Sequence, residues 1–92
     1  MPLNLNDIYF FQISENAVSI EFGHEISEEI LERITRLNKY IKQNPFSGLF
    51  STIPAYTTLT IYFNPVALMK DGGLNGITCL DKILGYIKSI NF

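Results

Sequence analysis

The sequence is short of the residues on which catalytic and metal sites depend. Its 92 residues include one cysteine, Cys79, and one histidine, His24. A lone thiol cannot form an internal disulfide, and a nucleophilic triad or a metal site needs several such side chains close together. We therefore interpret Cys79 as a packing residue and His24 as a turn residue, and we expect no cofactor and no metal.

Basic charge and long apolar runs are also scarce. Lys and Arg number 7 against 9 Asp and Glu, which gives a net charge of −2 and a pI of about 5.2. A domain of this charge lacks the basic surface that nucleic-acid binding requires. No run of apolar residues is long enough to cross a membrane, and no basic stretch precedes an apolar one at the N-terminus. The sequence predicts a cytoplasmic protein that binds neither nucleic acid nor membrane.

The charges that are present lie unevenly along the chain. Residues 1–32 hold seven acidic side chains and no Lys or Arg, whereas residues 33–92 hold all seven basic side chains and two acids. Two interpretations stay open. The charges match the dipoles of the helices on a solvated surface, or they form a polar surface that orients a partner.

The pattern of apolar residues predicts one small α+β domain over residues 1–92. Strand patterns cover 8–13, 17–22, 49–53 and 56–63, and helical patterns follow Ser27 and Thr78, which both have the character of N-caps. Asn64 and Pro65 begin a short helical turn, which lies between the two long helices in the sequence. The order is therefore β-β-α-β-β-α. Since each amphipathic helix needs an apolar surface to cover, we expect a four-stranded, mostly antiparallel sheet with both main helices packed on one face.

The second face of this sheet is predicted to be mixed in character. Alternation along the strands assigns to it eight residues: Ile8, Phe10, Gln12, Ser19, Glu21, Thr58, Thr60 and Tyr62. Either loops and the short helix cover this face, or it meets another domain or a second copy in a homo-oligomer.

The segment between the last two strands is the strongest candidate for a binding site. Pro54, Ala55, Tyr56 and Thr57 combine a rigid backbone with an amphipathic ring and a hydroxyl. Rigid residues and aromatic rings at the end of a sheet suit protein docking. The alternative is a corner at which the chain crosses between strands. The sequence leaves open whether the bond between Ile53 and Pro54 is cis.

Three stretches resemble motifs of a known family. Residues 14–23, SENAVSIEFG, are similar to its opening G-E/D-x-A-hydrophobic-x-hydrophobic-x-F-G. Residues 45–48, PFSG, and 53–65, IPAYTTLTIYFNP, are similar to its core P-x-x-G and P-A-Y-x-S/T-L-x-hydrophobic-x-Y/F-D-P. The family is the KipI-like group, which includes the B subunit of prokaryotic 5-oxoprolinase, also known as allophanate hydrolase subunit 1, and the sporulation kinase A inhibitor. The sequence departs from the pattern at Ser14, Ser51 and Asn64, where members usually carry Gly, Glu and Asp.

The resemblance implies the fold and two functions of different kinds. It implies the N-terminal α+β domain of such proteins, without the cyclophilin-like domain that normally follows it. The first function is that of a 5-oxoprolinase subunit, which acts with partner subunits in ATP-dependent opening of 5-oxoproline to glutamate. The second is a protein inhibitor that docks on the dimerisation and phosphotransfer domain of a sensor histidine kinase. In both cases we expect a protein partner and a domain that is not catalytically active alone.

Overall fold

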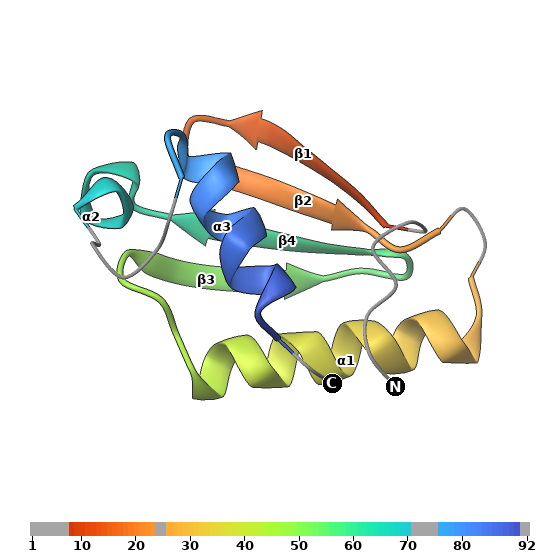
Figure 1. The fold of residues 1–92 in the computed structure, drawn as a ribbon. Coiled ribbons are helices and arrows are strands. Elements are labelled where there is room, and N and C mark those ends of the chain that lie inside the picture. Colours follow the sequence, from red (N-terminus) through yellow and green to blue (C-terminus); the bar gives the residue numbers. More distant parts are fainter. Residues whose placement is uncertain (1–7, 24–25, 71–75, 91–92) are drawn as a thin grey trace.

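The structure, a computed structural model, describes residues 8–23, 26–70 and 76–90, so His24 lies outside the described residues. Figure 1 shows both long helices on one side of the sheet. The predicted α+β architecture and element order are thus confirmed. The elements are β1 (Tyr9–Ser14), β2 (Ala17–Glu21), α1 (Glu28–Gln43), β3 (Leu49–Pro54), β4 (Thr58–Phe63), α2 (Pro65–Met69) and α3 (Cys79–Lys88).

The four strands form one sheet in the order β1-β2-β4-β3. All three neighbouring pairs are antiparallel. β1 and β3 are therefore the edge strands, and the central pair joins β2 and β4, which are separated in the sequence by α1 and β3. α1 packs against β3 and β4, whereas α3 packs against β1 and α2.

Both long helices begin at the predicted caps. The Ser27 hydroxyl accepts a hydrogen bond from the Ile30 N–H at 3.1 Å. At α3, the Thr78 hydroxyl accepts from the Asp81 N–H at 3.1 Å, and the Asp81 carboxylate accepts from the Thr78 N–H at 3.4 Å. These bonds satisfy N–H groups that the first turn of a helix leaves without partners.

The core lies between the sheet and the two long helices. The central strands and both helices supply side chains that are almost completely withdrawn from solvent, because each element presents one apolar stripe to the others. They include Val18, Ile20, Leu59 and Ile61 from the sheet, Ile34, Leu37 and Ile41 from α1, and Ile83 and Ile87 from α3.

The predicted phase of the first strand is wrong. Phe10 lies opposite Ile20 and Gln12 lies opposite Val18, so both belong to the face that the helices cover. Ile8 is likewise part of the core. Directly paired residues of antiparallel strands share a face, so the open face instead receives Tyr9 and Phe11.

Candidate interaction surface

The predicted docking tip lies where β3 turns into β4 (Figure 1). The Ala55 N–H donates to the Thr58 carbonyl at 2.8 Å and closes the turn. The Phe22 N–H donates to the Thr57 carbonyl at 2.8 Å and ties the turn to the end of β2. These two bonds hold the loop from both sides.

The tip is accessible to a partner. Pro54 and Ala55 are exposed, Thr57 is half-buried, and the Tyr56 side chain is 69% exposed. The bond between Ile53 and Pro54 is trans, since the described residues contain no cis peptide bond. The structure thus brings all four predicted residues together at one exposed end of the sheet.

The open face of the sheet is a second accessible surface. One row across it runs Phe11, Ser19, Thr60, Ile53 in strand order. The outer two side chains are 44% and 53% exposed, whereas Ser19 is buried. In this row, the large apolar side chains stand on the edge strands and the small polar ones lie on the central strands.

Each edge strand carries a bulge that adds to this apolar surface. The register of β1 shifts between Gln12 and Ser14, and that of β3 shifts between Leu49 and Ser51. The additional residues are Ile13, which is 56% exposed, and Phe50, which is 83% exposed. A bulge places two residues opposite one, leaves the extra residue unpaired and bends the strand.

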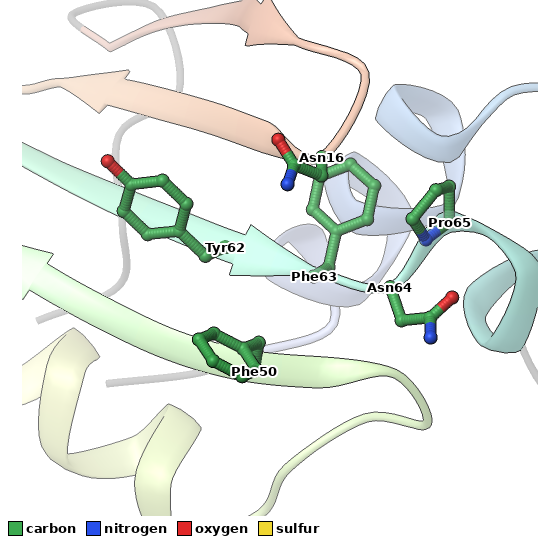
Figure 2. A pocket seen from close by; sticks show the side chains of 6 residues that line it. All are labelled: Asn16, Phe50, Tyr62, Phe63, Asn64 and Pro65. Carbon is green, nitrogen blue, oxygen red and sulfur yellow. The ribbon is translucent and has the colours of Figure 1, made fainter.

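The bulge in β3 forms one wall of a shallow pocket of about 390 Å³. Figure 2 shows that its residues come from the β1–β2 turn, the start of β3 and the junction of β4 with α2. This pocket lies at the opposite end of the sheet from the docking tip. It is lined by Asn16, Phe50, Tyr62, Phe63, Asn64 and Pro65.

The two amide side chains of the pocket are held in place by local hydrogen bonds. Asn64 Oδ1 accepts from the Val66 and Ala67 N–H groups at 3.0 and 3.2 Å, as the N-cap of α2. Asn16 Oδ1 accepts from the Ser14 hydroxyl at 2.7 Å. With both oxygens engaged, the amides have N–H groups left to donate.

Gly48 fixes the backbone beside this pocket. Its φ of +97° is unfavourable for residues with a side chain, and its carbonyl accepts from the Asn64 N–H at 2.7 Å. A Cβ atom there would lie 2.9 Å from both the Asn64 carbonyl oxygen and the Leu68 nitrogen. The conformation and the close approach both explain why the PFSG motif ends in glycine.

Tyr86 is the one described residue with a strongly shifted pKa, and its surroundings indicate a role in packing. Its ring contacts Phe46 edge-on, with 5.1 Å between centroids, and lies 6.4 Å from the Tyr40 ring. Burial, with a smaller contribution from Tyr40, raises its pKa from 10 to about 12. Because its hydroxyl bonds within the fold, we assign it to packing of the helices.

The described residues contain no candidate metal site. Among residues 8–23, 26–70 and 76–90, no three His, Cys, Asp or Glu side chains gather closely enough to hold a metal ion. Cys79 is half-buried, with its Sγ 3.9 Å from the Pro65 carbonyl oxygen. No helix in this part of the chain is long and apolar enough to cross a membrane.

Comparison with known proteins finds relatives that carry two different functional names. The B subunit of 5-oxoprolinase from Bacillus subtilis (strain 168) is 34% identical over 59 residues, which are 64% of this chain and 25% of that protein. The N-terminal domain of the histidine kinase inhibitor KipI from Bacillus subtilis is 25% identical, with a TM-score of 0.71 over 88% of this chain and 80% of that domain.

A crystal structure of a conserved uncharacterized protein from Pyrococcus horikoshii is also similar. It is 28% identical, with a TM-score of 0.69 over 87% of this chain and 32% of that protein. The chain therefore spans a quarter of the curated relative and about a third of the archaeal protein. The sequence profile of the carboxyltransferase domain, subdomain C and D, matches residues 8–82. With most of its length matched, and with the relatives above, the chain belongs to this carboxyltransferase subdomain family, the KipI-like family that its motifs indicated.

Proposed function

We propose that this domain is a docking part of a 5-oxoprolinase-like hydrolase. It acts with partner subunits that open the lactam of 5-oxoproline to glutamate with consumption of water and ATP. The observation that carries this proposal is the 34% identity with a protein named as the B subunit of 5-oxoprolinase. Because the match spans a quarter of that relative, the reaction is expected to need the cyclophilin-like domain and the other subunits.

The tip supports a docking role for this domain. Its turn is held by hydrogen bonds from Ala55 and Phe22, so little backbone freedom is left to lose on binding. The exposed ring of Tyr56 offers a large apolar surface with a polar end. Aromatic anchors of this kind often cost about 2 kcal/mol or more of binding energy when they are truncated.

The test is reconstitution of lactam opening with the remaining subunits and domain. We expect activity with this chain present and loss of activity without it. Tyr56→Ala combined with Pro54→Ala is expected to weaken assembly, whereas Met69→Ala, an exposed apolar residue on α2, serves as the matched control. Full assembly of the folded double variant would contradict the role of the tip. Full activity without the chain would contradict the hydrolase proposal.

The alternative function is inhibition of a sensor histidine kinase by docking on its dimerisation and phosphotransfer domain. It is favoured by the resemblance to the KipI N-terminal domain, 80% of which this chain covers. In this case the chain would lower autophosphorylation of a kinase from the same organism. Kinase inhibition with no effect on lactam opening would select the alternative over the hydrolase.

A further inference from the structure

The two edges of the sheet differ in how they are protected against pairing with another strand. β3 has a bulge at Phe50 and ends in Pro54, which has no N–H to donate. β1, with the sequence YFFQIS, contains neither proline nor a charged residue. Natural sheets usually protect an edge with charge, proline or a bulge. β1 has a bulge only near its end, so most of the strand lacks these devices.

The direction of the main-chain groups in β1 follows from the hydrogen bonds of β2. The Phe22 N–H donates to the Thr57 carbonyl, and the Phe63 N–H donates to the Asn16 carbonyl. Hydrogen-bonded pairs recur at every second residue of an antiparallel ladder. The even-numbered residues of β2 therefore bond to β4, and its odd-numbered residues turn their main-chain groups toward β1.

The same alternation then fixes the outer side of β1. Ser19 of β2 lies opposite Phe11, so these two form a hydrogen-bonded pair. Their neighbours Phe10 and Gln12 must direct their N–H and carbonyl groups away from β2, toward the free edge. The side chains of Tyr9, Phe11 and Ile13 meanwhile stay on the open face, 44–56% exposed.

We propose that β1 pairs with β1 of a second copy of this chain, antiparallel, about a two-fold axis at Phe11. In this register Phe10 of each copy lies opposite Gln12 of the other, and their outward N–H and carbonyl groups form two sets of reciprocal hydrogen bonds. The bulge at Ile13 lies beyond these bonds. Two sheets would thus join into one continuous sheet across the dimer.

The side chains in this register complement one another. On the open face, Phe11 meets its own equivalent and Tyr9 meets Ile13 of the other copy. Aromatic and β-branched cross-strand pairs stabilise an antiparallel sheet. No charged residue lies in β1, so the symmetric pairing opposes no like charges. The surface of a two-fold interface must be complementary to itself. In this register the open-face side chains of β1 meet this condition, because each lies opposite an apolar side chain of the other copy.

The first test measures the mass of the full chain in solution. Sedimentation equilibrium of the purified protein is expected to give about twice the 10.5 kDa of one chain. Phe11→Lys and Phe11→Glu should each give monomers, because like charges then meet at the axis, and an equimolar mixture of the two should restore the dimer. Ile53→Lys, on the same face at the other edge, is the matched control and should leave the dimer intact. Monomers of the unaltered chain at all concentrations would overturn the proposal.

The second test asks whether the dimer forms through the edge. Amide hydrogen exchange at Phe10 and Gln12 should be slow in the dimer and fast in the folded Phe11→Lys monomer, since these N–H groups point outward. A dimer in which both amides exchange as fast as in the monomer would overturn edge pairing and indicate contact through the sheet face. Circular dichroism of each variant establishes that it is folded.

Discussion

The Tyr86 hydroxyl of α3 donates a hydrogen bond to the main-chain carbonyl of Asn44, the C-cap of α1. The bond joins the two long helices across 42 positions of sequence. It also satisfies a carbonyl group at the end of a helix, where the regular pattern of bonds stops.

Removing this hydroxyl should weaken the contact between the helices. We expect Tyr86→Phe to lower the free energy of unfolding by about 1 kcal/mol, because the ring is kept and one hydrogen bond is lost. Urea denaturation followed by circular dichroism measures the change. Tyr56→Phe, at the exposed tip, is the control and should leave stability unchanged. Equal stability of the two variants would contradict the assigned role.

The same residue predicts how stability depends on alkaline pH. The pKa of Tyr86 is raised from 10 to about 12 in the folded protein, so folding favours the neutral phenol. The contribution of Tyr86 to the free energy of unfolding is fully present below pH 10 and is lost as the pH rises through 12. Unfolding curves of the natural sequence and of Tyr86→Phe should converge across this interval. A constant difference between them from pH 9 to pH 12 would contradict the prediction.

Gly48 and Gly85 should respond to alanine with opposite signs. Gly48→Ala forces a side chain into a left-handed conformation against the Asn64 carbonyl, which we expect to cost about 1–3 kcal/mol. Gly85→Ala, at an exposed position inside α3, should instead stabilise by about 0.5–1 kcal/mol. Thermal melting of the two variants gives both signs, and a neutral Gly48→Ala would disprove the steric argument.

The tip and the core should differ in their effect on stability. Leu59→Ala removes a fully buried side chain from β4 and should cost about 2–5 kcal/mol. Tyr56→Ala should change the free energy of unfolding by no more than about 0.5 kcal/mol, because its ring is mostly exposed. Denaturant titrations compare the two. A strongly destabilised Tyr56→Ala would mean that this ring supports the fold.

The element order could be predicted because the sequence signals were local. Ser27 and Thr78 mark helix starts through hydrogen bonds to residues three positions ahead. In β4 the strict alternation from Thr58 to Phe63 assigns each side chain to a face, and the structure agrees.

The phase of β1 could not be predicted in the same way. Tyr9, Phe10 and Phe11 are all large and aromatic, so composition does not distinguish the two faces. The phase depends on the register with β2, which the turn and the bulge near Ile13 set together. The assignment of Phe10 to the open face failed for this reason.

The pocket was missed because its residues come from separate parts of the chain. Asn16, Phe50 and Asn64 meet only once the sheet has formed and β3 has bulged. The Asn64-Pro65 pair did predict the start of α2, but nothing in the sequence placed it beside Phe50. The tip, in contrast, is one contiguous segment, so its position could be predicted although its partner could not.

The strand order also has a consequence for folding kinetics. Each hairpin joins neighbours in sequence, whereas pairing Ala17–Glu21 with Thr58–Phe63 must enclose the whole of α1. Closing a long segment costs more entropy than closing a short turn, and distant contacts slow folding. We therefore expect the hairpins to assemble early and the seam between them to be the rate-limiting event. Substitutions along that seam should slow refolding more than equally destabilising ones at the outer strands.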